Sequence, residues 1–308
     1  MNEVKKGFEY VKITENVIVM VPAKPIIEMY DASESVTTTC IALPNELIFV
    51  DCGSYPELVR KFRVEMETKF QKKTSHLLLT HTHWDHVIAM EVFKDVNIVV
   101  SEIGIQRIEN IITMIRDKGI EVIGITFDVT KGLAKIIANV NIFIPNIKVK
   151  DTEFRIESDG KELIYRVVGG HSPDSSYIYV PSEKIICTGD NLLECFAQIP
   201  GNPYETLDIF NIWESLEIKN VIPGHGKVVG KEYILQVRRY FKDLISVLEK
   251  LYAQGVSVKD AITHSSIPEY ISKHQPNWVE VLPGRKGISK KFTRSWYRFI
   301  KRRLKTSM

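Results

Sequence analysis

The sequence predicts an α/β protein in which two β-sheets pack face to face between flanking helices, a four-layer αββα sandwich. Two observations favour this fold. Strand and helix patterns alternate in two successive rounds, and four apolar strands are each followed by a polar turn that contains His or Asp. A chain of 308 residues suits one large domain or a core with an appendage. The alternation alone also fits other α/β arrangements.

The first round begins with strands, because apolar and β-branched runs there are separated by a Pro-Asn-Glu turn at residues 44–46. A helical segment, a buried apolar strand and two further helical segments come next. We therefore expect strands at 17–21, 37–43, 47–51 and 77–79, and helices over 56–72, 102–118 and 131–139.

The second round repeats this order with a longer series of strands. Its last helix has the amphipathic spacing of a surface helix, and several broken helical turns follow it to the end of the chain. We expect strands at 142–144, 153–156, 163–168, 177–180, 184–187 and 221–222, and helices over 207–217 and 231–253.

The composition, with 44% hydrophobic and 26% charged residues, is that of a globular protein. No run of about eighteen apolar residues exists, so we expect no membrane span. The N-terminus lacks the apolar core of a signal peptide. The cysteines, which have no C-x-x-C spacing, predict reduced thiols in a cytoplasmic protein. They are Cys40, Cys52, Cys187 and Cys195, of which Cys187 is the best candidate for the alternative of zinc ligation.

The C-terminal segment is strongly basic. Ten Lys and Arg and no acidic residue follow Glu280, whereas the first 280 residues carry 31 basic and 38 acidic side chains. We predict a catalytic domain over 1–253 and a basic helical extension over 254–308. Phe292, Trp296, Ile300 and Leu304 form an apolar stripe, so a packed terminal helix is expected. Nucleic-acid contact and a membrane-surface role are the alternatives.

The segment Thr-His-Thr-His-Trp-Asp-His at residues 80–86 is the strongest functional signal. Imidazole and carboxylate groups bind zinc or iron, and five polar residues after a core strand bury no apolar surface. His81 and His83 are two apart, so they share a face of an extended loop and can hold one metal ion. Asp85 and His86 can then serve a second ion nearby.

Three later turns offer the remaining ligands, because each places His or Asp among glycines just past an apolar strand. They are Gly-Gly-His-Ser-Pro-Asp-Ser with His171, Thr-Gly-Asp-Asn with Asp190, and Pro-Gly-His-Gly with His225. Each turn taken alone is more typical of an ordinary surface turn or helix cap. Together with the 80–86 segment, however, the three turns indicate metal ligation more strongly.

This order of motifs resembles the metallo-β-lactamase superfamily over roughly residues 15–250. Asp51, at the end of the strand before Cys-Gly, matches that family's first motif. The resemblance implies an αββα fold with His81, His83 and His171 on one metal ion. It implies Asp85, His86 and His225 on a second ion, Asp190 bridging the two, and Asp51 orienting the ligand loop.

Such a site would hold a metal-bridging hydroxide at neutral pH, with Asp85 and Asp190 as the catalytic carboxylates. Two divalent ions are expected; zinc is the default, and iron and manganese are alternatives. The reaction implied is hydrolysis of a small ester, thioester or lactone. A phosphodiesterase or nuclease acting on RNA or DNA is an alternative, as is a mononuclear-iron enzyme similar to persulfide dioxygenases.

Substrate choice depends on parts outside these motifs. The 80–86 segment is similar to that of glyoxalase II enzymes, but 87 residues separate His83 from His171, more than that family leads us to expect. Residues 103–137 within this span predict either an apolar lid or an extra pair of packing helices. Tyr177 and Tyr204 are candidates for stabilising an oxyanion, and Trp278, Trp296 and Tyr297 for lining the pocket. A homodimer is one of the open oligomeric states.

Overall fold

The computed structural model describes residues 8–23, 36–119, 141–194, 201–268 and 290–306. Its first sheet has seven strands in chain order, antiparallel from β1 to β4 and parallel from β4 to β7. These strands are β1 (Phe8–Lys12), β2 (Val17–Pro22), β3 (Thr38–Ala42), β4 (Leu47–Val50), β5 (Thr74–Leu78), β6 (Asn97–Ser101) and β7 (Ile147–Val149).

The second sheet has six strands in the order β13-β12-β11-β10-β9-β8, and only β11 and β12 are parallel neighbours. These strands are β8 (Glu153–Ser158), β9 (Lys161–Val167), β10 (Ser176–Val180), β11 (Ile185–Leu193), β12 (Asn220–His225) and β13 (Val229–Gly230).

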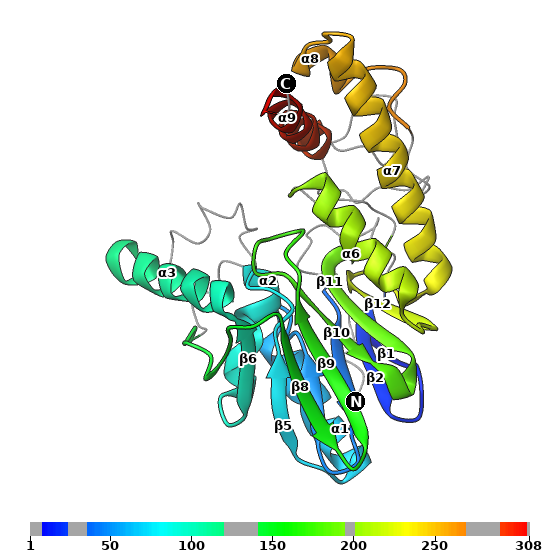
Figure 1. Cartoon of the computed structure of the whole chain (residues 1–308). Coiled ribbons are helices and arrows are strands. Elements are labelled where there is room, and N and C mark those ends of the chain that lie inside the picture. Colours follow the sequence, from blue (N-terminus) through cyan, green and yellow to red (C-terminus); the bar gives the residue numbers. More distant parts are fainter. Residues whose placement is uncertain (1–7, 24–35, 120–140, 195–200, 269–289, 307–308) are drawn as a thin grey trace.

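Helices cover the outer faces of both sheets, so the predicted αββα sandwich is confirmed (Figure 1). In Figure 1, α3 extends to one side of the sandwich, and α7 rises beyond it to meet α8 and α9. The helices are α1 (Pro56–Phe70), α2 (Trp84–Val87), the 3₁₀ helices η3 (Ile88–Phe93) and η4 (Pro181–Glu183), α3 (Glu102–Lys118), α6 (Pro203–Ser215), α7 (Lys231–Ala253), α8 (Val258–Ala261) and α9 (Lys290–Thr306).

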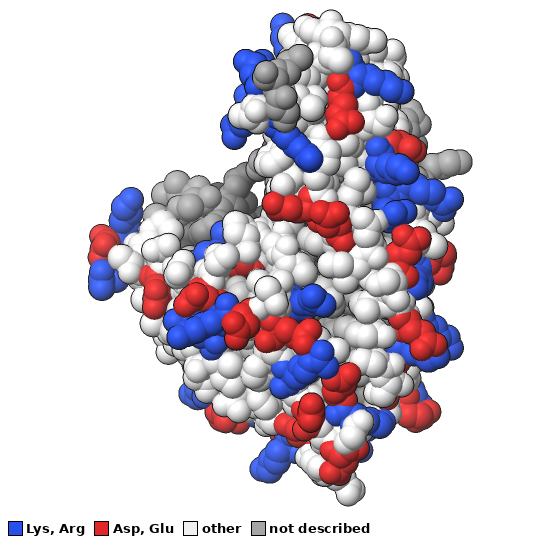
Figure 2. Space-filling model, viewed as in Figure 1, with Lys and Arg blue, Asp and Glu red and all other residues white. Residues whose placement is uncertain are grey.

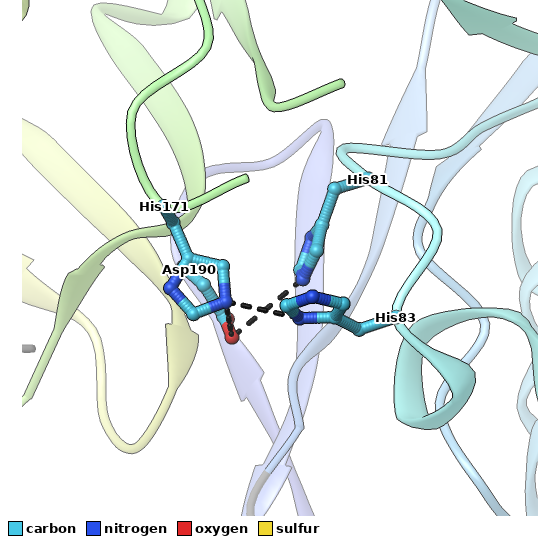
Figure 3. A group of neighbouring side chains, drawn as sticks. All are labelled: His81, His83, His171 and Asp190. Carbon is cyan, nitrogen blue, oxygen red and sulfur yellow. Dashed lines mark hydrogen bonds and ion pairs between the residues drawn. The ribbon is translucent and has the colours of Figure 1, made fainter. Parts of the chain in front are cut away.

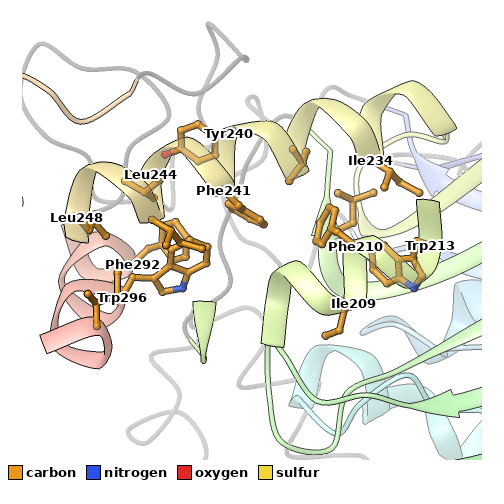
Figure 4. Close-up of a cluster of buried hydrophobic side chains, with 14 of the residues drawn as sticks. Ile209, Phe210, Trp213, Ile234, Tyr240, Phe241, Leu244, Leu248, Phe292 and Trp296 are labelled. Atoms are coloured by element: carbon orange, nitrogen blue, oxygen red, sulfur yellow. The ribbon is translucent and has the colours of Figure 1, made fainter. Parts of the chain in front are cut away.

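Three apolar clusters separate these layers. One lies between the two sheets, where Val19 and Ile48 of the first sheet meet Tyr165 and Ile178 of the second. A second cluster lies under α1 and η3 on the outer face of the first sheet. The third joins the second sheet to α6, α7 and α9 (Figure 4). The C-terminal helix is therefore packed into the protein by its apolar stripe, as expected.

Several local predictions differ from the structure. Residues 142–144 form no strand, and the edge strand β7 begins at Ile147 instead. The sequence patterns missed β1 and β6. The helix expected after the 80–86 segment is one turn of α2 followed by η3. The expected helix over 131–139 lies outside the described residues.

Two further expectations concern reduced cysteine thiols and the absence of a membrane span. Cys40, Cys52 and Cys187 are free and buried, whereas Cys195 lies outside the described residues. Burial raises the pKa of the Cys187 thiol to about 12. None of the helices in the described ranges has both the length and the apolar character that a bilayer crossing needs.

Candidate metal centre

The 80–86 segment leaves β5 as a short loop and ends in the first turn of α2. His83 is the last extended residue, with φ −65° and ψ 144°, and Asp85 and His86 lie in the helical turn that follows. Because of this change in backbone conformation, the side chains of His81 and His83 point in a different direction from those of Asp85 and His86. His81 and His86 are fully buried, so the segment is part of the interior rather than a surface loop.

One group of possible ligands contains His81, His83, His171 and Asp190, whose nearest nitrogen and oxygen atoms all lie within 4.8 Å of one another. Figure 3 shows the three imidazole rings and the carboxylate pointing toward a common centre from three separate segments. His171 Nε2 lies 3.0 Å from His83 Nδ1 and 3.4 Å from Asp190 Oδ2. His81 Nε2 lies 3.7 Å from the same carboxylate oxygen.

A second group contains Asp85, His86 and His225, also with donor atoms within 4.8 Å of one another. His225 ends β12, and its Nε2 lies 3.4 Å from both His86 Nε2 and Asp85 Oδ2. All three residues are buried. The sequence placed these residues in the same two groups, and their role as metal ligands stays a prediction.

Asp190 lies between the two groups. Its Oδ2 faces His81 and His171, whereas its Oδ1 lies 3.2 Å from His86 Nε2 and 3.3 Å from His225 Nε2. The sequence suggested that Asp190 sits in a turn after a strand. It lies instead within β11, where the pairing with β12 shifts register around Gly189. One carboxylate can therefore contact two ions.

The polar atoms of this centre fit divalent metal ions. His81 Nε2 and Asp190 Oδ1 are buried, and neither makes a hydrogen bond within the described part of the chain. A buried polar atom that makes no hydrogen bond is costly, and coordination of a cation removes that cost. Imidazole nitrogens and carboxylate oxygens suit zinc, iron and manganese alike.

Burial and the neighbouring charges set the protonation of these side chains. Burial, with neighbouring charges opposing in part, lowers the pKa of His83 to about 4 and that of His81 well below its ordinary value, so both rings are neutral. Burial also opposes a charge on His86, but Asp190, Asp51 and Asp85 raise its pKa well above the ordinary value. A metal ion binds the neutral form of imidazole, so metal binding at His86 would displace its proton.

A family comparison decides how this arrangement is classified. The model of the metallo-beta-lactamase superfamily matches residues 34–225, which include all seven side chains of the two groups. The chain belongs to this superfamily.

Three similar proteins each share less than 25% sequence identity with this chain. A metallo-beta-lactamase type 2 from Bacillus sp. (strain 170) is 24% identical over 203 residues, and the match covers 61% of this chain and 66% of that enzyme. A metallo-beta-lactamase from Pontibacter korlensis has a TM-score of 0.54 at 17% identity, covering 77% of this chain and 99% of the other. The inverting sec-alkylsulfatase from Pseudomonas sp. has a TM-score of 0.63 at 15% identity, covering 96% and 50%.

Asp51, predicted from the superfamily's first motif, lies behind the centre as expected from its position. It directly follows β4 and has the left-handed φ of +52°. Its Oδ2 lies 2.9 Å from His86 Nδ1, and its carboxylate accepts hydrogen bonds from the Thr80 amide and hydroxyl. A carboxylate in this position fixes the ring orientation of a metal-binding histidine.

A second buried carboxylate was missed by the sequence reading. Asp174 is fully buried, accepts hydrogen bonds from Thr82 and Ser172, and forms an ion pair with Arg107. Burial would raise its pKa, but the Thr82 hydrogen bonds and the Arg107 charge outweigh burial and lower that pKa. The only signal in the sequence was the presence of Asp174 three residues after His171, in a motif whose histidine alone drew attention.

The aromatic side chains suggested for stabilising an oxyanion or for lining the pocket lie elsewhere or outside the described residues. Tyr177 packs edge-on against Trp213 in the third cluster, and Trp296 and Tyr297 are buried, so none of the three lines the centre. Tyr204 hydrogen bonds to Glu249 instead. Trp278 lies outside the described residues.

The walls of the accessible space come from other segments. A cavity of about 610 Å³ lies beside His171, between the turn at 167–173 and the start of α6, with Asn202 and Glu205 on its far side. Of the 103–137 segment, α3 is described and the remainder is not. Cys187 packs between the sheets and belongs to neither group of possible ligands, so the structure gives no support to zinc ligation by Cys187.

Proposed function

We propose that this protein is a dinuclear metal-dependent hydrolase of a small ester, thioester or lactone. Superfamily membership and the two His/Asp groups support metal-dependent hydrolysis. The observation that carries the dinuclear assignment is Asp190, whose two carboxylate oxygens face different groups of histidines. Zinc is the metal that we expect, with iron or manganese as alternatives.

The ions, when bound, would supply a hydroxide nucleophile at neutral pH and polarise the bond to be broken. The chain provides the positions. In this proposal Asp190 bridges the two groups and Asp85 accepts the proton of the attacking water. Asp85 belongs to the second group, where its Oδ2 lies 3.4 Å from His225 Nε2. Burial of both carboxylates keeps bulk water from competing for these positions.

A small substrate is supported by the space next to the centre. The cavity beside His171 has about the volume of pockets that take drug-sized ligands. Since the Pseudomonas relative is named a sec-alkylsulfatase and the Bacillus relative a metallo-beta-lactamase, sulfate esters and β-lactams belong in the substrate panel with carboxylic esters, thioesters and lactones.

The test is hydrolysis of that panel by the purified protein, measured with and without a chelator and after metal is restored. We expect turnover of at least one acyl substrate that the chelator abolishes and the metal restores. His171→Ala should lower turnover at least 100-fold. His264→Ala is the matched control, because His264 contacts Ser266 far from the centre and should behave like the wild type. Absence of metal-dependent turnover on every substrate would rule the proposal out.

A phosphodiesterase is the second candidate, and the surface of α9 favours it. Arg294, Arg298, Arg302, Arg303 and Lys305 are exposed on this helix. Figure 2 shows Lys and Arg gathered around its end of the molecule. A basic stripe of this kind suits phosphate groups.

Charge reversal on this helix tests the second candidate. If the natural substrate is a nucleic acid, single-stranded RNA should bind at low salt, and the double variant Arg294→Glu/Arg298→Glu should weaken that binding at least tenfold. If the wild type binds RNA negligibly at low salt, the nuclease candidate is excluded and the acyl hydrolase is the remaining proposal.

A further inference from the structure

The two threonines of the Thr-His-Thr-His segment are held in the same way by two different buried carboxylates. Asp51 accepts hydrogen bonds from the Thr80 amide and hydroxyl, both at 2.8 Å. Asp174 accepts from the Thr82 amide at 2.7 Å and from the Thr82 hydroxyl at 2.6 Å. Each threonine directly precedes a histidine of the first group, so each carboxylate fixes the backbone from which a ligand side chain starts.

Asp174 also belongs to the turn that carries His171. Its Oδ1 accepts a hydrogen bond from Ser172 Oγ at 2.7 Å, and its backbone carbonyl accepts one from Ser101 Oγ at 3.2 Å. One side chain therefore joins the turn of His171 to the loop of His81 and His83. These are the three histidines of the first group.

Arg107 of α3 completes this arrangement. Its Nε lies 3.2 Å from both Asp174 Oδ1 and Thr82 Oγ1, and a third of its side chain is exposed. A fully buried carboxylate needs a compensating charge, and Arg107 supplies it. The helix that begins the long 103–137 segment is thereby tied to the ligand loop.

We propose that Asp174, held by Arg107, is the positioning residue for the first metal-binding group. The proposal rests on the dinuclear centre inferred above and names a residue that acts on one half of it. Asp51 differs because it serves both groups: it binds Thr80 next to His81, and it contacts His86 of the second group directly. Carboxylates behind metal ligands typically change metal affinity by about 10–100-fold when they are altered.

Cobalt titration in two single-site backgrounds tests the proposal. His225→Ala leaves the first group intact, and His171→Ala leaves the second intact. We expect Asp174→Asn to weaken Co²⁺ binding about 10–100-fold in the His225→Ala background. In the His171→Ala background the change should be less than about threefold. An equal loss in both backgrounds, or no loss in either, would overturn it.

A measurement that needs no metal separates this proposal from the metal centre itself. In metal-free protein, Asp174→Asn should raise hydrogen exchange of the Thr82 amide at least tenfold and leave the Thr80 amide unchanged. Asp51→Asn should do the reverse. If the wild type binds no Co²⁺, the proposed dinuclear centre is refuted. If hydrogen exchange of the Thr82 amide is unchanged in Asp174→Asn, the positioning role of Asp174 is refuted.

A milder variant covers the possibility that Asp174→Asn does not fold. Thr82→Val removes the hydroxyl, and with it the hydrogen bonds to Asp174 and from Arg107, but keeps the hydrogen bond from the Thr82 backbone N–H to Asp174. It should weaken Co²⁺ binding in the His225→Ala background in the same direction, by about threefold to tenfold. Binding equal to that of the parent would count against the proposal.

Discussion

Gly189 lies directly against Thr80, so that a Cβ atom at Gly189 would come within 2.6 Å of Thr80 Oγ1. Gly189 also has a φ of +52°, in the left-handed region that favours glycine. Because Thr80 is bound to Asp51 and Gly189 precedes Asp190, this contact sets how closely β11 approaches the loop after β5. The glycine of the Thr-Gly-Asp motif is thus required both by packing and by backbone conformation.

Gly189→Ala should destabilise the protein by about 2–4 kcal/mol, since it combines overpacking with a strained φ. Gly160→Ala is the control, because Gly160 also has a positive φ, +75°, but has no atom within 4 Å of an added Cβ. It should cost about 1 kcal/mol. Urea unfolding of both variants measures the difference, and equal losses would show that the contact with Thr80 contributes nothing.

The sequence predicted the layers of the sandwich and the grouping of the His and Asp side chains better than the edge strands of the sheets. Periodicity marks a strand or helix when one face is buried, so α3 and α7 were found with their observed bounds. The edge strand β1 has a mixed pattern of burial, and β7 is only three residues long, so neither carried such a pattern.

The grouping of the His and Asp side chains could be predicted because each lies in a short motif, and the order of these motifs resembles that of the superfamily. The partnership of Asp174 with Thr82 and Arg107 could not be found in this way. It joins residues 92 and 67 positions apart in the chain, and only the folded chain brings them together.

The C-terminal helix should contribute strongly to stability. Trp296 is fully buried, with ring centroids 5.0 Å from Phe241 and 4.5 Å from Phe292. Trp296→Ala should cost about 3–5 kcal/mol in the free energy of unfolding. Arg298→Ala, on the exposed side of the same helix, should change it by less than about 0.5 kcal/mol.

These two variants also bear on the predicted boundary at residue 253. A single unfolding transition that shifts as a whole in Trp296→Ala would mean that α9 is part of the main cooperative unit. A separate early transition, with the rest unchanged, would mean that the extension folds independently.

Protonation of Glu67 in acid should make the protein less stable. Burial would raise its pKa, but hydrogen bonds from Thr74 and Arg63 outweigh burial and lower the pKa below the ordinary value of 4.5. Its contribution is therefore present above pH 4.5 and is lost as the pH falls through the lowered pKa. Glu67→Gln should cost about 1–2 kcal/mol at pH 7.

Urea unfolding at several pH values checks this sign. The difference between wild type and Glu67→Gln should shrink as the pH falls below 4.5, whereas Glu109→Gln, an exposed residue of α3, should match the wild type throughout. A difference between wild type and Glu67→Gln that stays constant with pH would show that the Glu67 charge is not the cause.

The most direct test of the dinuclear centre is the metal content of the wild type and of Asp190→Ala, measured by elemental analysis after dialysis against buffered metal. Because Asp190 faces both groups, the wild type should retain two divalent ions per chain, His225→Ala one, and Asp190→Ala fewer than one. A wild type with a single iron ion, unchanged by His225→Ala, would contradict the account, as would two tightly held ions in Asp190→Ala.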